Sequence, residues 1–324
     1  MKALDTWERV LVALIVAVYV AFGLGIDGFL SPYAVADSTY NFSEKALIAL
    51  AMALLVIAGD IDLSIAATMA LASLAMGFAM KAGAGLPLML VAGVAVGAAC
   101  GALNGWLVTR WKLPSIVVTI GTLSLYRGLA QVVLGDQAIT GYPETLSQWG
   151  NGTVGDLLGA PWLIVPIEFA VLVVMALAVG LFLHHTVHGR RVYAIGANPV
   201  ASRFSGIAVD RYRFGLFVFA GVMAALAAVL LTGRIGSTRP NLAMGWELDA
   251  VTIVILGGVA IEGGRGSILG TVLAAVLLGS FTFALGMLNV SGIVMSMIVG
   301  VLLIVAMVLP RGLRLLRPTG WKAA

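Results

Sequence analysis

The sequence predicts an all-α fold: a polytopic bundle of transmembrane helices forming one domain over residues 1–324. Hydrophobic residues make up 61% of the chain and charged residues only 10%, with a mean hydropathy of +1.06. Soluble domains average about 45–50% apolar and about 25% charged residues. Whole segments such as 10–22 and 170–183 contain no charged residue, although a helix on a soluble protein needs a polar face. Lipid must therefore surround much of this chain.

Apolar segments long enough to form helices at membrane depth occur in order along the whole chain. A span needs about 20 residues, and clusters of Gly, Pro and polar residues at 31–43, 81–87, 135–162 and 234–247 are typical of connections. We expect about ten spans, or eleven if a broken helix re-enters the membrane. The ten windows are 8–27, 44–58, 63–80, 86–108, 114–134, 163–183, 213–233, 248–260, 266–288 and 292–310.

The distribution of Lys and Arg favours an even number of spans with both termini in the cytoplasm. In that topology 14 of the 19 basic residues face the cytoplasm, as the positive-inside rule requires. The loop at 184–213 is then cytoplasmic and the loop at 135–162 is external. The cytoplasmic bases are Lys2, Arg9, Arg110, Lys112, Arg190, Arg191, Arg203, Arg211, Arg213, Arg265, Arg311, Arg314, Arg317 and Lys322.

Two of the windows are too short for ordinary spans. The apolar run at 46–58 is closed by Gly59-Asp60-Ile61-Asp62, and the run at 248–260 is closed by the segment 261–266. Runs of about 10–14 apolar residues are typical of broken or re-entrant segments, which line transport paths in many transporters. The alternative is that both are ordinary short helices that end in loops.

The sequence contains no motif for enzymatic chemistry. It lacks a phosphate-binding loop, a zinc-binding motif and a nucleophile elbow, so we expect no catalytic residue, metal or cofactor in this chain. The net charge of +4 is explained by cytoplasmic loops and does not predict nucleic-acid binding. His184 and His188 would share a helix face and allow a metal, but a polar helix end is the simpler interpretation.

The cytoplasmic segment after the sixth window predicts a short isolated helix. Asn198 is a good N-cap, Pro199 suits the first helical position and Gly206 ends the helix after about two turns. A helix this short is not stable alone in water, and Val200 and Phe204 give it a small apolar face. We therefore expect it to dock on a partner, or alternatively to lie against the bilayer surface.

Four segments together resemble one family. The stretch YAIGANPVASRFSGIAVDRYR at 193–213 is similar to the cytoplasmic coupling segment of the ribose-type ABC sugar permeases, in which a short helix inserts into a groove on the ATPase. The resemblance continues at 59–77, 104–129 and 247–279 with the same order and spacing. Within the family, the chain is most similar to the permeases for rhamnose and for the autoinducer-2 furanose.

The resemblance implies an ABC importer permease fold in a bacterial inner membrane. The importer would contain two permease subunits, identical or paralogous, two ATPase subunits that carry ATP and Mg²⁺, and a periplasmic sugar-binding protein. The loop at 135–162, which contains Asp136, Glu144 and Asp156 but no Lys or Arg, would face that binding protein or be a solvated connection. The residues implied in coupling to the ATPase are Gly196, Asn198, Pro199, Ala201, Ser202, Arg203, Gly206 and Ile207.

Polar residues near the two breaks are candidates for the translocation path. Buried carboxylates facing lipid would each cost about 2.5–3.5 kcal/mol, so the acidic ones must face water or partners. They would either accept hydrogen bonds from sugar hydroxyls or cap the following helix, and Glu262 would otherwise pair with Arg265. The candidates are Asp60, Asp62, Ser64, Asn104, Thr119, Thr122 and Glu262.

Two further features concern packing between spans. Glu168 and Arg127 are isolated charges inside predicted spans, which would pair with each other, act in transport or, for Arg127, reach the interface. Glycines at positions 93, 97, 101 and 105 predict close helix contact within the subunit or across a dimer.

Transport of a monosaccharide driven by a separate ATPase is the leading functional prediction. The alternative is a stand-alone secondary transporter or channel for a small polar solute, which would also contain broken helices and buried acids but would not need the helix after Asn198.

Overall fold

Each of the ten predicted windows contains a helix. The structure is a computed structural model and describes residues 5–301 and 304. In this part of the chain six helices are long and apolar enough to cross a membrane, and the bent pair Pro32–Asn41 with Ser43–Ile57 raises the number to seven if it is one span. The six are α1 (Thr6–Gly25), α5 (Leu86–Arg110), α6 (Ser115–Leu134), α9 (Ile167–His185), α12 (Val209–Ile235) and α14 (Ile268–Met287).

Shorter elements fill the intervals. The apolar helices α4 (Ile65–Lys81) and Gly292–Val301 are 10–17 residues long, and the two windows predicted as short give α3 (Ser43–Ile57) and α13 (Trp246–Leu256). The end of the tenth window lies outside the described residues, as do the cytoplasmic bases assigned before residue 5 and after 304. The other elements are α2 (Pro32–Ser38), η1 (Thr39–Asn41), β1 (Ile139–Thr140), α7 (Glu144–Asn151), α8 (Val154–Leu158), α10 (Val187–Ala197), α11 (Pro199–Phe204) and β2 (Ser237–Thr238).

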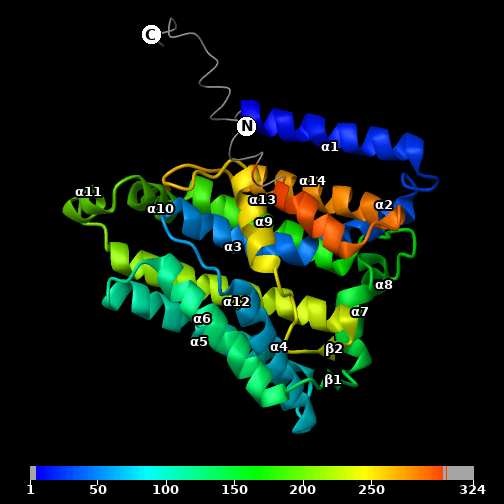
Figure 1. Cartoon of the computed structure of the whole chain (residues 1–324), viewed down its shortest axis with the longest axis horizontal. Coiled ribbons are helices and arrows are strands. Elements are labelled where there is room, and N and C mark those ends of the chain that lie inside the picture. Colours follow the sequence, from blue (N-terminus) through cyan, green and yellow to red (C-terminus); the bar gives the residue numbers. More distant parts are fainter. Residues whose placement is uncertain (1–4, 302–303, 305–324) are drawn as a thin grey trace, which may run out of the picture.

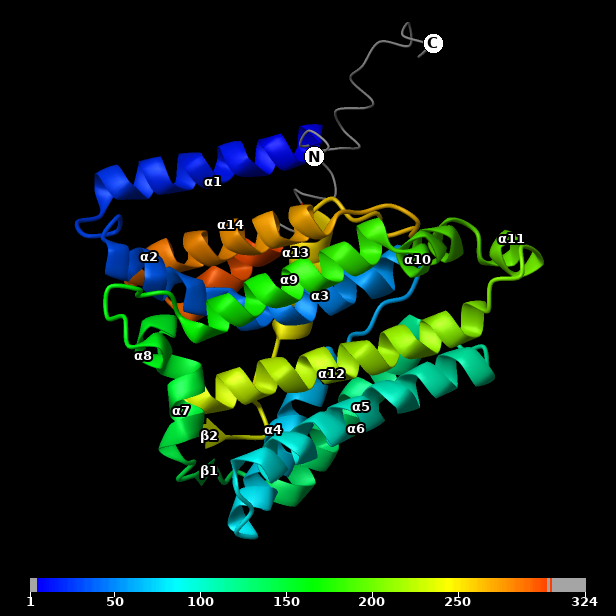
Figure 2. The ribbon, with the colours of Figure 1, turned by 180° about the vertical axis from the view of Figure 1, so that it is seen from behind.

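The long helices form two layers (Figures 1 and 2). In one layer α1, α14, α9 and α3 run roughly side by side, and in the other α12, α5 and α6 do so, with α4 among them. Helix α12 contacts α5 and α4 in its own layer and α3 in the other, so it joins the two. Helix α11 projects at one end of the bundle, whereas α7 and α8 lie at the opposite end (Figure 2).

Burial separates the core helices from those that face lipid. Fourteen of the 15 residues of α3 are buried, all but Lys45, so this short helix is surrounded by protein on every side. Helix α1, in contrast, has only Leu11 buried and exposes apolar side chains, as a lipid-facing helix does. Its first turn is attached to the core because the Trp7 indole nitrogen donates a hydrogen bond of 2.8 Å to the Leu256 carbonyl.

The glycine stripe at Gly93–Gly105 packs within the chain. A Cβ at Gly97 would lie 2.4 Å from the carbonyl oxygen of Gly221, and a Cβ at Gly101 would lie 2.2 Å from that of Phe217. Both contacts are with α12. Only glycine permits this approach of two backbones, so the stripe fixes α5 against α12 inside one subunit.

Three of the predicted connections contain regular structure. The segment 31–43 includes α2 and η1, the segment 234–247 includes β2, and the loop 135–162 includes β1, α7 and α8. Strand β1 pairs with β2 in a two-residue antiparallel ladder, a small departure from an all-α fold. Helix α7 packs closely on α12, since a Cβ at Gly150 would lie 2.1 Å from the Arg234 nitrogen.

Candidate functional site

The helix predicted after Asn198 is present as α11. The Asn198 Oδ1 atom accepts hydrogen bonds from the backbone nitrogens of Val200 at 3.0 Å and Ala201 at 2.9 Å, and Pro199 occupies the first helical position. Gly206, with φ of +79°, follows directly after the end of the helix, where a left-handed residue is favourable. The helix spans six residues, from Pro199 to Phe204, which is close to the two turns expected.

The apolar face of α11 has no cover in the described chain. Val200 is 62% exposed and Phe204 is 90% exposed, although side chains of this kind gain free energy from burial. Ser202 is buried, so the opposite side of α11 faces the protein. The arrangement presents two apolar side chains outward from the end of the bundle.

Ion pairs orient α11 relative to the membrane helices. The Arg203 guanidinium lies 2.7 Å from the Asp210 carboxylate, and the same carboxylate lies 2.6 Å from Lys112 Nζ. Asp210 belongs to the first turn of α12, and Lys112 lies in the turn between α5 and α6. Exposed pairs such as these contribute little stability, so they connect α11 to α12 and to the α5–α6 turn without adding much to the free energy of folding.

Next to the start of α11, three chain segments are in direct backbone contact. The Gly264 nitrogen donates a hydrogen bond of 2.8 Å to the carbonyl of Ile57, the last residue of α3. Gly196, near the end of α10, lies against both groups, since a Cβ there would be 1.8 Å from the Ile57 oxygen and 2.5 Å from the Gly264 nitrogen. Gly59 and Gly263 at the same place have φ of +88° and +84°. We call Ile57, Gly59, Gly196, Gly263 and Gly264 the glycine junction.

The glycine junction connects the two predicted breaks with each other and with α11. Gly59 begins the break after α3, and Gly263 and Gly264 belong to the break after α13. Gly196 lies only two residues before Asn198, the N-cap of α11. The start of α11 is therefore in backbone contact, through Gly196, with the end of α3 and with the loop that follows α13.

Tyr193 of α10 joins this helix to the loop after α13, beside the glycine junction. Its hydroxyl donates a hydrogen bond of 2.7 Å to the Gly266 carbonyl and lies 3.3 Å from His184 Nδ1. Burial raises the pKa of Tyr193 from 10.0 to about 12, so the phenol remains a donor in the native protein well above neutral pH.

We expect the Tyr193→Phe substitution to lower the free energy of unfolding by about 1 kcal/mol, the usual contribution of one hydrogen bond. Because the pKa of Tyr193 is raised in the native state, the native chain retains a proton that the unfolded chain loses. The contribution is therefore complete below pH 10 and is lost as pH rises towards 12. Thermal unfolding of the purified protein between neutral pH and pH 11 measures this; an equally steep alkaline loss in the phenylalanine variant would contradict the assignment.

The break after α3 is fixed by a buried ion pair. Asp60 is 1% exposed and accepts two hydrogen bonds from the Arg213 guanidinium, one of them from Nε at 2.6 Å. Arg213 lies one turn into α12. The carboxylate therefore joins α12 to the end of α3, directly beside the glycine junction.

Asp62 anchors the start of α4 rather than facing open space. Its Oδ1 atom accepts hydrogen bonds from the Ser64 nitrogen at 2.9 Å and the Ser64 hydroxyl at 2.7 Å. Asn104 Nδ2 donates to the Ser64 hydroxyl at 2.8 Å and approaches Asp62 Oδ1 at 3.5 Å. All three side chains are buried and bond to one another just before α4, whose N-cap Ser64 makes no side-chain capping bond to the helix.

The two threonine candidates are buried in α6. Thr119 Oγ1 donates to the Ser115 carbonyl at 2.9 Å and to the Ile61 carbonyl at 3.2 Å, and Ser115 Oγ accepts from the Ile61 nitrogen at 3.2 Å. Thr122 Oγ1 donates within its own helix to the Val118 carbonyl at 3.1 Å. Five of the seven path candidates, namely Asp60, Asp62, Ser64, Asn104 and Thr119, thus lie at the break after α3, and Thr122 lies one turn further along α6.

Glu262 lies apart from that cluster. It is exposed in the loop between α13 and α14 and lines a cavity of about 320 Å³ that also includes Gly196, Ala197 and Gly264. The sequence placed this carboxylate near membrane depth in contact with water or partners. Its exposed side chain lies beside the glycine junction, on the α11 side of the bundle.

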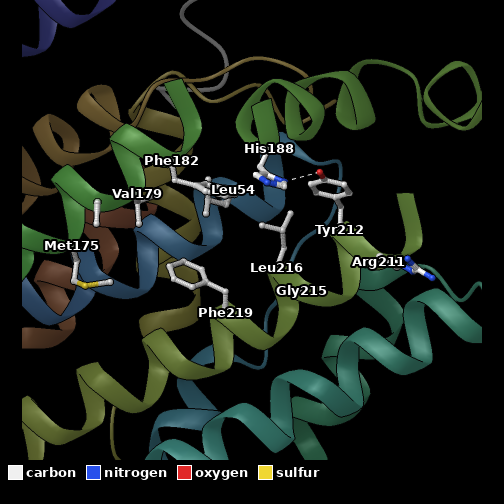
Figure 3. A pocket seen from close by; sticks show the side chains of 11 residues that line it. Leu54, Met175, Val179, Phe182, His188, Arg211, Tyr212, Gly215, Leu216 and Phe219 are labelled. Carbon is white, nitrogen blue, oxygen red and sulfur yellow. Dashed lines mark hydrogen bonds between the residues drawn. The ribbon is translucent and has the colours of Figure 1, made fainter. Parts of the chain in front are cut away.

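A larger cavity of about 520 Å³ separates the two layers near α10 (Figure 3). Apolar side chains of α9 and α12 line it, among them Val179, Phe182 and Phe219. His188 and Tyr212 border it and are joined by a hydrogen bond of 2.8 Å. An apolar lining offers few groups to sugar hydroxyls, so this cavity does not suit a sugar site.

Residues 35–307 match the model of the family described as branched-chain amino acid transport system / permease component. The chain belongs to this permease family. The match covers all the helices from α3 to α14 and includes the glycine junction and α11. The protein is therefore a multi-pass membrane component of an ABC importer and neither an ATPase nor an enzyme.

The permease is also similar to proteins of known description. It is 35% identical over 308 residues to the Autoinducer 2 import system permease protein LsrD of Escherichia coli (strain K12) and of Shigella flexneri, covering 93% of this chain and 91% of each relative. The protein of the same name from Escherichia coli O157:H7 is 34% identical over the same lengths. No solved structure gives a significant match.

The histidines of the permease do not form the predicted helical pair. Helix α9 ends at His185, and Thr186 has the extended dihedrals φ −108° and ψ 161°. His184 and His188 therefore belong to different helices, α9 and α10, and do not share a face. Within the described residues no group of three or more His, Cys, Asp or Glu side chains is placed to hold a metal ion.

The isolated membrane charges do not pair with each other. Arg127 donates hydrogen bonds to the carbonyls of Pro240 at 3.0 Å and Leu242 at 2.6 Å. Glu168 instead lies 3.5 Å from Arg234. The sequence suggested a Glu168–Arg127 pair as one option, and this option is wrong because the two residues lie against different segments.

Several residues important to the permease site were not identified from the sequence. Arg213 and Lys112 were counted only as cytoplasmic charges, and Asp210 and Tyr126 received no role. Tyr126 donates to the Cys100 carbonyl at 3.0 Å and lies 3.4 Å from Asn104 Oδ1. A basic residue one turn into a span is a usable signal for Arg213, since it must find a carboxylate or reach the interface.

Proposed function

We propose that this permease imports a small sugar-like solute of the autoinducer 2 type, powered by separate ATPase subunits that bind α11. The similarity to the autoinducer 2 import permeases, over 93% of the chain, supports the substrate class. The observation that carries the coupling role is the uncovered apolar face of α11, with Phe204 90% exposed. The ATP and Mg²⁺ belong to the ATPase in this proposal, and the permease binds no cofactor itself.

Movement of the ATPase subunits reaches the membrane helices by two routes in this proposal. The ion pairs of Arg203 and Lys112 with Asp210 connect α11 to α12 and to the α5–α6 turn. The glycine junction connects the start of α11 to α3 and α13. Because packed helices move as rigid bodies, a displacement of α11 would tilt the layer containing α3 relative to the layer containing α12.

The remaining partners follow from the two ends of the bundle. We place both termini and α11 in the cytoplasm, because the bases of the α5–α6 turn and of the α10–α12 segment gather at one end and the positive-inside rule assigns that end inside. The α7–α8 segment then faces a periplasmic binding protein. A second permease subunit, identical or paralogous, would complete the path.

We assign a structural role to most of the path candidates. Asp60 is paired with Arg213, and Asp62, Ser64 and Asn104 satisfy one another. Buried groups whose hydrogen bonds are made within the protein would lose them on binding a sugar. Their function in this proposal is to hold the break after α3 in shape while the helices move.

We expect Phe204→Asp to reduce ATP-driven uptake at least tenfold without loss of the permease from the membrane. The side chain contacts little of its own chain, so the fold should tolerate the change, whereas a buried carboxylate in an apolar groove of the ATPase is costly. The measurement is uptake of labelled solute into cells or vesicles that contain the permease with its ATPase and binding protein. Phe204→Leu is the matched control and should retain most of the uptake.

A second variant tests whether α11 packs closely against the ATPase. Ala201 is exposed on α11, and Ala201→Glu should abolish stimulation of the ATPase for the same steric and electrostatic reasons. Full uptake in both Phe204→Asp and Ala201→Glu would contradict docking through α11. Transport by the purified permease alone in liposomes, without an ATPase, would favour a secondary transporter instead.

A competition experiment tests the substrate class. Uptake of labelled autoinducer 2 should be reduced by related furanoses and pentoses in excess, and should be insensitive to branched-chain amino acids. The reverse pattern would show that the permease serves an amino acid importer.

A further inference from the structure

At the end of the bundle opposite α11, two buried glutamates face one arginine. Glu44 is in the first turn of α3, Glu168 is in the first turn of α9 and Arg234 is in the last turn of α12. Arg234 Nε lies 2.8 Å from Glu44 Oε1 and 3.5 Å from Glu168 Oε1. Both glutamate side chains are 0% exposed, and that of Arg234 is 28% exposed. We call these three residues the glutamate cluster.

The charges of the glutamate cluster do not balance if both acids are ionised. Two carboxylates and one guanidinium leave a net charge of −1 in a buried site, and such an uncompensated charge costs several kcal/mol. The structure records no second cation against either glutamate in the part of the chain it describes. Lys45, which follows Glu44, is held 2.6 Å from Asp249 on α13.

The hydrogen bonding of the cluster also indicates that the two glutamates are not both ionised. Glu44 Oε2 and both oxygens of Glu168 are buried and have no donor among the described residues. Both carboxyl groups instead face the same Arg234 Nε atom, at 2.8 Å for Glu44 and 3.5 Å for Glu168. Ionised carboxylates can only accept hydrogen bonds, so with both acids ionised these buried oxygens would have no donor.

We propose that Glu44 and Glu168 form a proton-binding site that holds one exchangeable proton between them. Arg234, which bonds to Glu44 at the shorter distance, pairs with the carboxylate of Glu44, and the proton resides on Glu168 and is donated to Glu44 Oε2. This arrangement gives Glu44 Oε2 a donor and reduces the cluster charge to zero. The proposal goes beyond import and does not depend on the identity of the solute.

The surroundings identify the ligand as a proton rather than a metal ion. Only two residues supply oxygens, no group of three or more acidic or His/Cys ligands occurs in the described chain, and the guanidinium repels a cation at this distance. Tyr40 lies beside Arg234, with its ring centre 5.9 Å from the guanidinium, but its hydroxyl donates to the Asn151 carbonyl at 3.2 Å.

The other elements that pack against the glutamate cluster carry few further charged residues. Helix α14, which contacts both α3 and α9, contains no titratable residue. Asp37 on α2 influences Tyr40, and Glu144 on α7 is exposed. The partly exposed Arg234 gives water a route to the cluster. The proton can therefore exchange when the helices separate slightly.

Because the cluster joins α3, α9 and α12, its proton links the packing of these helices to pH. The native chain binds one proton that the unfolded chain, with freely ionised glutamates, does not bind at neutral pH. Stability therefore falls as pH rises through the range in which this proton is lost. Loss of the proton leaves two facing carboxylates, which repel α9 from α3.

Infrared spectroscopy of the full-length permease in lipid nanodiscs tests the proposal directly. We expect a carboxylic-acid carbonyl band at neutral pH that is absent from both Glu168→Gln and Glu44→Gln, because removing either acid leaves one carboxylate for Arg234. Glu144→Gln, at an exposed position on α7, is the matched control and should retain the band. A band that is absent from the unmodified protein, or unchanged in Glu168→Gln, would overturn the proposal.

The pH dependence of thermal unfolding supplies a second measurement. The unmodified permease should lose stability as pH rises, with a slope that corresponds to about one proton. Glu168→Gln keeps a neutral side chain with a donor and should remove this slope, whereas Glu144→Gln should preserve it. Equal slopes for Glu168→Gln and the unmodified protein would exclude an exchangeable proton at this site. Neither measurement involves an ATPase or a solute, so failure here is distinct from failure of the import proposal.

Discussion

Gly196→Ala is expected to disrupt the glycine junction and to abolish ATP-driven uptake. A Cβ at this position would lie 1.8 Å from the Ile57 oxygen and 2.5 Å from the Gly264 nitrogen, and both are backbone atoms that no rotamer change can move. Relief requires separation of α10 from the ends of α3 and α13. Overpacking of this kind costs about 3 kcal/mol, at the upper end of its usual range.

The measurement is the thermal unfolding midpoint of the purified permease together with uptake in the assembled importer. Gly121→Ala is the matched control: this glycine is also helical, but a Cβ there meets nothing within 4 Å, so the change should be neutral or slightly stabilising. An alanine at 196 that leaves both the unfolding midpoint and uptake unaltered would show that the three segments do not meet as described.

Arg213→Gln is expected to lower the free energy of unfolding by about 3–5 kcal/mol, because removal of one partner leaves a buried charge uncompensated. Asp60 is the charge in question: its side chain is 0% exposed, and that of Arg213 is 22% exposed. The effect should exceed that of removing Lys112 or Arg203 from Asp210, since those pairs are 42–51% exposed and exposed pairs contribute little.

A double-mutant cycle isolates the interaction. Asp60→Asn combined with Arg213→Gln removes both charges and keeps two polar groups of similar shape, so the double variant should recover most of the stability lost by Arg213→Gln alone. Thermal unfolding of the four proteins gives the coupling energy. Additive effects, with no recovery in the double variant, would contradict a direct pair between α12 and the break after α3.

The sequence predicted the helical content of the chain well because hydrophobicity is a local property. Each of the ten windows contains a helix, and Asn198, Pro199 and Gly206 placed α11 correctly because a cap, a first-turn proline and a terminating glycine act within a few residues. The structured segments at 31–43 and 135–162 were missed because their helices are short and their formation depends on packing, as that of α7 against α12 shows.

The partners of buried charges could not be predicted in the same way. Arg127 and Glu168 were evident in the sequence as charges within apolar segments. Arg127 donates hydrogen bonds to the carbonyls of Pro240 and Leu242, whereas Glu168 lies beside Arg234. Each contact joins residues separated by tens of positions in the chain, and no pattern in one sequence specifies which spans are neighbours. The helix face shared by His184 and His188, which the sequence allowed but did not favour, is absent because the helix is interrupted at Thr186.

By itself, the sequence determined that this protein is a helical membrane protein with a short helix after Asn198 and two interrupted apolar segments, because composition, periodicity and capping are read along the chain. The resemblance to a family indicated a permease. Only the tertiary structure decided that the two interruptions and the base of α11 meet at Gly196, and that Glu44, Glu168 and Arg234 share one buried site. Both depend on distances between segments that are remote in sequence, and those distances are set by the packing of α3 and α12 together.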